Sequence, residues 1–363
     1  MNSSFRKSLL WIHTWSGLTI GLVVVFLATT GAGFVLRPQL DTVFNRDLLV
    51  VPACTERLPL DILADHARAV HPADELSSIE VTAGANTSVA IQFTDKDYVY
   101  VNPCSGGVLG VRNEFGGFFG TFEWLHRFRF MDRSVGVQVA GSAVAVFIVF
   151  LIVGGIVLWW PRSRLALKSA FKFNPRLPRR ARTLSLHRVV GVYASLILLM
   201  IALTGMPIAF IPVKEMIYRH WGYTEPVVPR SVLRQGAEFL PMERFWQNTQ
   251  AAVPGLEWVS LHYPDKPDAA VKVEIRERQV PHEDAKSYLY MDAYTGSTLQ
   301  LRRYSDIGLG RKIYLYCVAL HSGLVGGLLY QLMLLLAALA VPVQAYSGFS
   351  PYLRRKIRPA RSL

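Results

Sequence analysis

Cysteine and acidic residues are scarce in this sequence, and the motifs of soluble redox cofactors are missing. The sequence has three cysteines among 363 residues and no C-x-x-C-H motif. No G-x-G-x-x-G motif follows a predicted strand, so we do not expect the chain to hold NAD or a flavin. These absences leave the long apolar segments as the main source of information.

The basic residues are concentrated in three short segments that contain no acid. Of 39 lysines and arginines, 15 lie in the leader 1–8, the loop 161–183 and the tail 344–363, and the other 24 are balanced by 26 acidic residues. A nucleic-acid surface would need its basic residues on one folded face, whereas these flank apolar segments. We therefore expect no nucleic-acid partner, and we expect the basic segments to lie against anionic lipid.

Four segments are long and apolar enough to cross a bilayer. They are 9–36, 135–160, 184–211 and 313–343, in a chain that is 51% hydrophobic with a mean hydropathy of +0.27. Polar regions 37–134 and 212–312 follow the first and the third. Because basic segments mark the cytoplasmic side, both termini are expected in the cytoplasm and both polar regions outside. The first segment lacks a convincing cleavage site and is expected to be retained.

The two halves of the chain resemble each other at an offset of 174 residues. The aligned pairs are His13 and His187, Gly17 and Gly191, Thr30 and Thr204, and Gly31 and Gly205. Further along, "YVYVNPCSGGVLG" parallels "YLYMDAYTGSTLQ", and both alternate at period two into a glycine turn at Gly106 and Gly296. The predicted fold is a membrane α-helical protein with four transmembrane helices, built as two parallel repeats of span, small outer α+β domain and span.

Four histidines occupy repeat-related places near the ends of these spans. His13 lies in a stretch from Leu9 to Leu36 that has no other titratable side chain, and His187 is its counterpart. His126 and His321 lie just before, or at, the outer ends of the second and fourth spans. An ionisable residue in a membrane segment indicates a functional site. Parallel repeats place equivalent residues at equal depth, so the sequence predicts one pair of histidines in each leaflet.

Two imidazoles without further donors suit a haem iron better than a zinc ion. Structural zinc takes four ligands and catalytic zinc three, and no third donor lies at the depth of His13 and His187. A haem iron needs two axial ligands because the porphyrin supplies the rest. Gly17 and Gly191, each four residues after its histidine, leave room for a flat ring on the same helix face. The absence of C-x-x-C-H excludes covalent attachment, so the prediction is two b-type haems with two histidines each.

Each of these residues also has a simpler interpretation. A single histidine near a helix end commonly bonds a backbone carbonyl, and a small residue in a span commonly serves helix packing. His220, at the outer end of the third span, has no counterpart in the first half and is kept as a reserve ligand for the outer haem. The other histidines lie in the polar regions, where they are expected to be solvated: His66, His71, His262 and His282.

The pattern of "LHRVVG", "LHSG" and the two glycine-turn hairpins resembles the PepSY-associated transmembrane family over nearly the whole chain. Within that family it is similar to bacterial inner-membrane ferric-siderophore reductases. The resemblance implies haem in the membrane, PepSY domains in the periplasm and reduction of iron in an imported chelate. His13, His126, His187 and His321 are the positions that match the family's histidines. One departure from the family pattern is Cys104, where a tyrosine or threonine is more usual.

Two haems stacked across the bilayer would form an electron path from a quinol or a cytoplasmic donor to a ferric siderophore outside. No catalytic acid, base or nucleophile is assigned. The acceptor is expected beside the outer haem, near a set of aromatic and basic residues that otherwise serve as interfacial anchors: Phe118, Phe119, Trp124, Arg127, Arg129 and Tyr314. Three alternatives remain open: a PepSY sensor or binding module without redox activity, a transporter, and a cytochrome b that serves a protein acceptor.

Two of the three cysteines, Cys54 and Cys104, belong to the first outer region. Because that compartment is expected to be oxidising, the sequence predicts a disulfide between them, with two free thiols as the alternative. Cys317 falls in the expected fourth span and is predicted to be a buried thiol.

Overall fold

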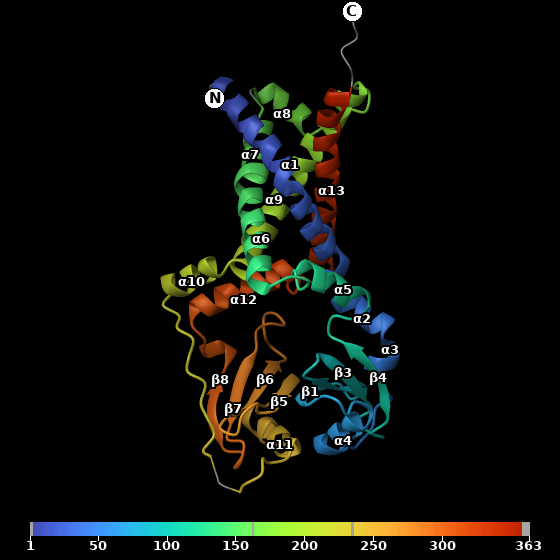
Figure 1. The fold of residues 1–363 in the computed structure, drawn as a ribbon, viewed down its shortest axis with the longest axis vertical. Helices are drawn as coiled ribbons and strands as arrows, with labels where there is room; N and C mark the ends of the chain where they lie inside the picture. The colour runs from blue at the N-terminus through green and yellow to red at the C-terminus, as the bar shows by residue number, and fades with distance from the viewer. Residues whose placement is uncertain (1–2, 162, 234–235, 358–363) are drawn as a thin grey trace, which may run out of the picture. The chain divides into compact units, whose positions relative to one another are not determined.

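The computed structural model describes residues 3–161, 163–233 and 236–357, and the chain forms two compact units (Figure 1). The helical unit comprises Met1–Leu36, Phe122–Met216 and Leu320–Leu363. The sheet unit comprises Arg37–Thr121 and Ile217–Ala319. The basic side chains of the expected tail lie outside the described side chains.

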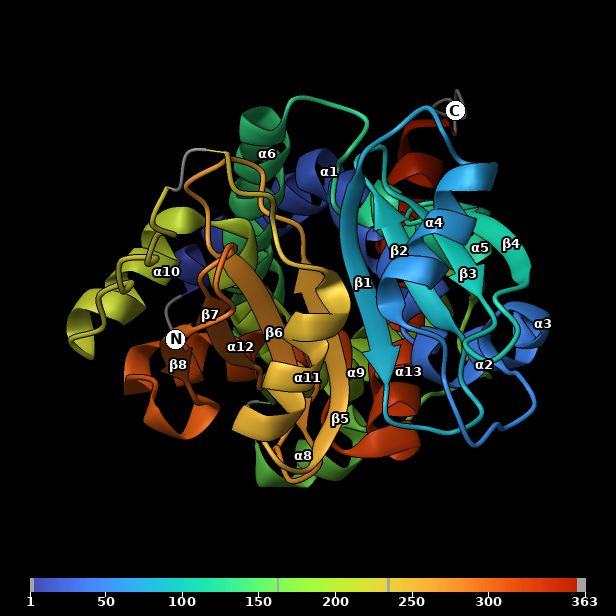
Figure 2. The same ribbon diagram turned by 90° about the horizontal axis from the view of Figure 1, so that it is seen from below.

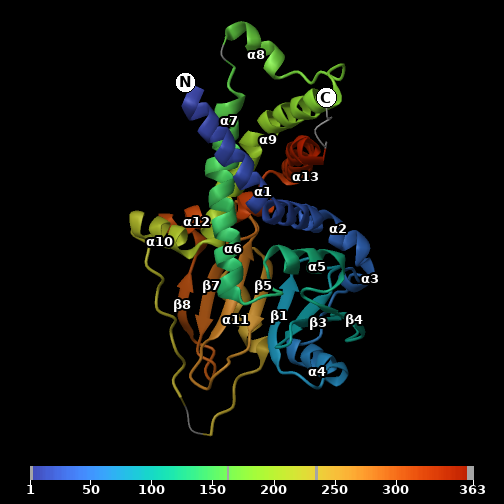
Figure 3. The same cartoon turned by 45° about the horizontal axis from the view of Figure 1, so that its top comes forward.

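Long apolar helices make up the helical unit. In order they are α1 (Ser3–Phe34), α6 (Arg133–Val146), a π-helical segment (Phe147–Val153) that runs into α7 (Gly154–Trp159), α9 (Arg179–Ala209) and α13 (Gly327–Ile357). Among the described residues, four helices are long and apolar enough to cross a membrane: α1, α6 through α7, α9 and α13. The short helix α8 (Arg164–Ala170) belongs to the basic loop between α7 and α9 (Figure 3).

The four long helices lie side by side and share an apolar core (Figure 1). Small residues alternate with branched ones in this core, and they allow the helix backbones to approach closely. Its buried members are Val24, Ile152, Ala194, Leu198, Ala202, Ala337 and Val341. Large apolar side chains on the outside, such as Leu22 and Leu196, are exposed, as expected of helices that face lipid.

The fourth apolar helix begins later than the sequence analysis expects. Segment 313–343 contains two helices, because α12 (Leu309–Ser322) ends before α13 starts at Gly327. Gly323, Gly326 and Gly327 between them have φ angles of +78°, +74° and +64°, a region that side chains strongly disfavour. Cys317 therefore lies in α12 rather than in the spanning helix, and it is half-buried.

The sheet unit contains one eight-stranded antiparallel sheet. Its strands are β1 (Leu76–Thr82), β2 (Val89–Phe93), β3 (Asp97–Val101), β4 (Val108–Asn113), β5 (Leu256–His262), β6 (Val271–Glu277), β7 (Ser287–Met291) and β8 (Thr298–Arg302). The order is β4-β3-β2-β1-β5-β6-β7-β8, so each half of the chain supplies a four-stranded meander. The two expected α+β regions are present, but they share this sheet: β1 pairs with β5 from Ser78 opposite His262 to Thr82 opposite Trp258. Joining the two inner strands leaves neither of them as an exposed edge.

Two amphipathic helices cover one face of the sheet. α4 (Leu60–Val70) and α11 (Met242–Ala252) lie side by side on it (Figure 2) and bury apolar residues against the strands. Each helix also caps the other, because Asp61 of α4 accepts hydrogen bonds from the first amides of α11 at 2.8 and 3.0 Å. Glu243 of α11 accepts one from the amide of Leu60 at 2.9 Å. These contacts satisfy orphan amides at both helix starts and connect the two halves of the unit.

The predicted hairpin turns and the predicted disulfide are present. Gly106 and Gly296 have φ angles of +72° and +70°, which a glycine adopts without strain. Cys54 and Cys104 form a disulfide with a Cα–Cα distance of 6.0 Å. The prediction of this bridge is confirmed.

The remaining short helices also belong to the polar regions. They are α2 (Arg37–Phe44), α3 (Arg46–Leu49), α5 (Gly117–His126), α10 (Ile211–His220) and the 3-10 turn Tyr304–Asp306. α5 and α12 matter most for the site, because α5 ends at His126 and the last turn of α12 contains His321.

Candidate functional site

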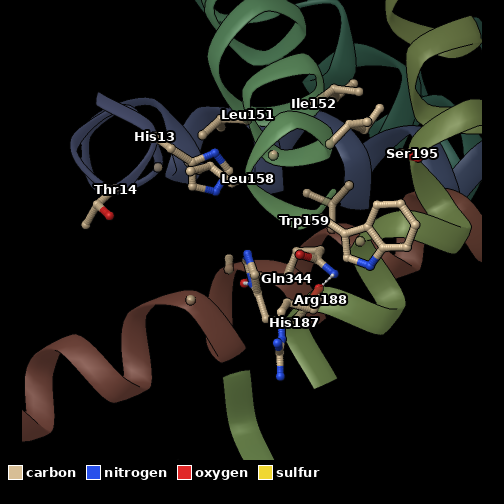
Figure 4. Close-up of a pocket in the computed structure, with 18 of the residues that line it drawn as sticks. His13, Thr14, Leu151, Ile152, Leu158, Trp159, His187, Arg188, Ser195 and Gln344 are labelled. Atoms are coloured by element: carbon tan, nitrogen blue, oxygen red, sulfur yellow. Dashed lines mark hydrogen bonds between the residues drawn. The ribbon is translucent and has the colours of Figure 1, made fainter. Parts of the chain in front are cut away.

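A cavity of about 640 Å³ opens between the helices of the helical unit. Its lining is mostly apolar and comes from α1, the π-helical segment, α7, α9 and α13. His13 and His187 both line it, together with Gly17 and Gly191, and Figure 4 shows the two rings around this space. The volume falls in the range of about 300–1,000 Å³ that is usual for cofactor sites.

His13 and His187 lie opposite each other, with ring centroids 6.2 Å apart. The Nδ1 atom of His13 is 2.8 Å from the backbone oxygen of Phe150 in the π-helical segment. The Nδ1 atom of His187 is 3.1 Å from the backbone oxygen of Gln344 and 3.2 Å from the hydroxyl of Ser347. The predicted proximity of these two residues is therefore found in the structure.

His126 and His321 form a second pair with nearly the same separation, 6.1 Å between centroids. The Nδ1 atom of His126 lies 2.9 Å from the backbone oxygen of Leu27 and 3.2 Å from the hydroxyl of Thr30. The Nδ1 atom of His321 lies 2.9 Å from the backbone oxygen of Ile201. The ends of α5 and α12 thus bring these two rings against α1 and α9.

Each of the four rings rests on a glycine of the helix that supplies its carbonyl. A Cβ atom added to these glycines would lie 2.6 Å from Cε1 of His321 at Gly205, 3.1 Å from Cε1 of His126 at Gly31, and 3.3 Å from Cε1 of His13 at Gly155 and of His187 at Gly348. In three cases the glycine follows the carbonyl residue by four positions, so both lie on one helix face. We call these four glycines the ring seats.

The π-helical segment accounts for the fourth spacing. Phe150 precedes Gly155 by five positions, and it lies within Phe147–Val153, where the backbone makes the wider i→i+5 turn. Because the π-helical turn contains one extra residue, the carbonyl of Phe150 and Gly155 still lie on the same face of the helix. π-helical turns inside α-helices often occur at functional sites, and this one orients His13.

The geometry of both pairs fits a metal held between two imidazoles. A hydrogen bond at Nδ1 fixes the ring and leaves Nε2 as the ligand atom, an arrangement common among metal-bound histidines. Within the described residues, none of the four Nε2 atoms has a hydrogen-bond partner. Metal–nitrogen bonds of about 2.0–2.1 Å place the centroids of two opposed imidazoles roughly 6.2–6.4 Å apart. The observed separations of 6.2 and 6.1 Å match that value.

The lining of the cavity suits a flat amphipathic group. Gly17 and Gly191 both line it, and a Cβ atom at Gly17 would lie no closer than 3.8 Å to Leu151. Arg6 and Arg188 are the arginines among the lining residues, and Arg6 donates to the backbone oxygen of Leu158 at 3.0 Å. Guanidinium groups beside an apolar cavity favour a ligand with carboxylates at one edge.

The expected acceptor residues are divided between the two units. Phe118, Phe119 and Tyr314 belong to the sheet unit, and Trp124, Arg127 and Arg129 to the helical unit. Phe119 is buried, and its ring stacks on that of Phe44 with centroids 5.9 Å apart. Arg127 pairs with Glu123 at 2.8 Å, and Tyr314 lies beside the Arg311 guanidinium at 5.3 Å. Phe118, at 61% exposure, is the most accessible aromatic of the set.

His66 is exposed as expected, whereas two of the other histidines take different places. His220 is exposed and stacks on Trp221, and it belongs to the sheet unit, whereas His126 already has His321 as its neighbour. His282, expected to be solvated, is 4% exposed and lies 3.3 Å from the hydroxyl of Tyr304. Burial lowers the pKa of His282, so the neutral ring is favoured there.

The ring seats and the carbonyl acceptors were not identified from the sequence. Gly31 and Gly205 stood out as aligned positions, but nothing in the sequence connected them with His126 and His321, which lie on other helices. A signal was available in the shared "Thr-Gly" at these two places.

These features define a multi-pass membrane protein with two paired-histidine sites among its helices. Residues 10–355 match the PepSY-associated TM region family, and the chain belongs to that family. No curated protein matches the chain.

Proposed function

We propose that this protein is a haem-containing reductase of the bacterial inner membrane, which passes electrons across the bilayer to the iron of a ferric siderophore. Two b-type haems would be held, one by His13 and His187 and the other by His126 and His321. When bound, these groups supply one-electron transfer. Reduction weakens the hold of hard oxygen ligands on the iron, which releases it as Fe(II).

The observation that carries this proposal is the duplicated geometry of the histidine pairs. The two pairs have nearly the same separation between their rings. In both pairs each Nδ1 lies within hydrogen-bonding distance of a backbone carbonyl, and each ring packs against a glycine. Isolated histidines that satisfy a local carbonyl would have no reason to meet in pairs at a metal-bridging distance. A zinc site is disfavoured, because no cluster of three or more ligand-bearing side chains was found at either pair among the described residues.

The residues of the chain have separable roles in this proposal. The carbonyls of Phe150, Gln344, Leu27 and Ile201 accept the Nδ1 protons and thereby select the tautomer with a free Nε2. The apolar core between the pairs, with Leu198 and Val341, excludes water from the path. Arg6 and Arg188 are placed to pair with the carboxylates of the group in the cavity.

The same proposal covers the orientation and the partners. Both termini would be cytoplasmic, and the two repeats would be parallel, related by an axis along the membrane normal. The sheet unit would then lie in the periplasm, where its Cys54–Cys104 disulfide is stable. The electron donor would be a quinol or a cytoplasmic protein. The acceptor would contact Phe118 and Tyr314, or Trp124, Arg127 and Arg129.

The proposal is tested by the colour and haem content of the purified full-length protein. We expect about two haems per chain and a low-spin spectrum. His13→Ala and His321→Ala should each lower that number toward one, because water is a poor substitute for an imidazole in an apolar site. His220→Ala is the matched control and should keep both haems, since His220 is exposed and distant in sequence from both pairs.

The two single variants should also differ in electron flow. His13→Ala should lose delivery from a cytoplasmic-side donor, whereas the chemically reduced variant should still be oxidised by added ferric siderophore. His321→Ala should keep reduction of the remaining haem and slow siderophore reduction. A colourless protein from haem-replete cells would refute the proposal and favour a PepSY sensor without redox activity.

A further inference from the structure

A second group of ligand-bearing side chains lies in the sheet unit, away from all four paired histidines in the sequence. His71 is the residue at the C-terminal end of α4, Asp74 lies in the loop before β1, and Asp95 lies in the turn between β2 and β3. The Nε2 atom of His71 is 3.0 Å from Oδ2 of Asp95 and 3.6 Å from Oδ2 of Asp74. One ligand atom from each of the three residues lies within 4.8 Å of the other two.

The three side chains are oriented by their own contacts. The His71 ring packs edge-on against Phe93 with centroids 4.6 Å apart. The other oxygen of each carboxylate is already engaged, because Oδ1 of Asp95 accepts from the amide of Asp97 at 3.0 Å and Oδ1 of Asp74 accepts from the hydroxyl of Thr94 at 3.4 Å. Nε2 of His71 and Oδ2 of Asp95 are hydrogen-bonded to each other at 3.0 Å, and Oδ2 of Asp74 lies beside them, so one nitrogen and two oxygens face a common point.

His71 is the partner of both aspartates, and among the described residues no lysine or arginine joins the group. A comparable histidine–carboxylate contact, His262 with Glu274, is compensated by two lysines on the same carboxylate at 2.8 and 3.0 Å. Two carboxylates carry two formal negative charges and one imidazole carries at most one positive charge, so the group keeps a net negative charge that a divalent cation would offset.

The fold does not require a histidine at this place. In the other half of the sheet unit, the residue at the C-terminal end of α11 is Val253, which is fully buried. An apolar residue can therefore occupy the position after this helix, so packing alone does not account for an imidazole at position 71.

We propose that His71, Asp74 and Asp95 bind one divalent transition-metal ion such as Zn²⁺ or Mn²⁺. Ligand atoms about 2.0–2.2 Å from a metal lie roughly 3.0–3.6 Å apart in octahedral or tetrahedral sites, close to the observed 3.0 and 3.6 Å. The imidazole favours zinc, manganese or ferrous iron over calcium and magnesium, which prefer oxygen ligands alone. Three protein ligands leave a position open for water or an exchangeable group.

The test is a titration of chelator-treated full-length protein with zinc chloride, followed by calorimetry. The wild type should bind one more equivalent than His71→Gln, and Asp95→Asn should bind that equivalent at least about tenfold more weakly. Asp95→Asn retains the oxygen that accepts from the amide of Asp97, so the turn is expected to fold. His262→Gln is the matched control and should leave the titration unchanged.

The result also has outcomes that would overturn the site. Equal zinc binding by the wild type and His71→Gln would show that the cluster is a histidine–carboxylate ion pair. An equal loss in His262→Gln would place the binding elsewhere. Haem content is measured on the same samples and should be unaffected in every variant, so failure of this proposal is distinguishable from failure of the haem assignment.

Discussion

The ring seats allow a sharp test, because alanine at Gly205 adds one methyl group at a known place. Its Cβ atom would lie 2.6 Å from Cε1 and 2.9 Å from Nδ1 of His321. Carbon atoms in good contact are about 3.5–4.0 Å apart, so the ring must move by roughly 1 Å. The Nδ1 contact to the backbone oxygen of Ile201, now 2.9 Å, would be stretched beyond hydrogen-bonding distance.

The cost of this change follows from two terms. Overpacking of a tight site costs about 1–3 kcal/mol, and the lost hydrogen bond about 1 kcal/mol more. Both costs affect the position of the His321 ring and not the stability of α9, because alanine is a better helix former than glycine. We therefore expect Gly205→Ala to fold with unchanged helical content but to lose the low-spin signal of one haem and to retain about one haem per chain.

The four seats should respond in the order of their distances. Gly31→Ala, with its Cβ 3.1 Å from Cε1 of His126, should weaken binding of the same haem by less than Gly205→Ala does. Gly155→Ala and Gly348→Ala, each with its Cβ 3.3 Å from the ring of His13 or His187, should have the smallest effect, and it should fall on the other haem. Gly154→Ala is the control on the same helix, because its Cβ would lie an ordinary 3.5 Å from Leu9.

The assay is the haem-to-protein ratio by pyridine haemochrome, together with low-temperature electron paramagnetic resonance of the ferric protein. If Gly205→Ala keeps two haems with unchanged low-spin resonances, then the ring of His321 is not held by this seat, and the geometric basis of the proposed haem site fails.

Two further predictions concern the sheet unit, and both use thermal unfolding of the full-length protein. Asp61→Ala removes the side chain of α4 that caps α11, and it should lower the free energy of unfolding by about 1–2 kcal/mol. Asp65→Ala is the control: it removes an exposed ion pair within α4 and should cost less than about 0.5 kcal/mol. Equal effects of the two variants would contradict the capping role. Burial alone would raise the pKa of Glu274, but the hydrogen bond from His262 and the charge of Lys286 outweigh it and hold that pKa below its usual range. A depressed folded pKa means that this carboxylate stabilises the fold above about pH 4.3 and that the contribution is lost as the pH falls further. Glu274→Gln should therefore flatten the decline in unfolding temperature between pH 6 and pH 3, and an unchanged slope would show that another group controls it.

The sequence by itself determined the features that depend on composition and local pattern. Apolar runs without charges mark the spanning helices, because a bilayer admits few unpaired charges whatever the packing. The register of the two halves singled out His13 with His187, and the places of His126 and His321 at the outer ends of the second and fourth spans singled out the other pair. The sequence also predicted two further features correctly. Gly106 and Gly296 were expected in turns because glycine tolerates positive φ angles, and the Cys54–Cys104 disulfide was expected because these are the two cysteines in the first polar region.

Only the tertiary structure decided the features that depend on which helices and strands meet. The seats and carbonyls of each histidine lie on another helix, 120 residues away in the case of His321 and Ile201. The joining of β1 with β5 makes one sheet of two halves, and the glycines at 323–327 end α12 before the last span. The convergence of His71 with Asp95 likewise needed the fold. The sequence pattern shows the periodicity of each helix or strand separately. These features depend on how closely different helices and strands pack against each other, and no local stretch of sequence specifies that packing.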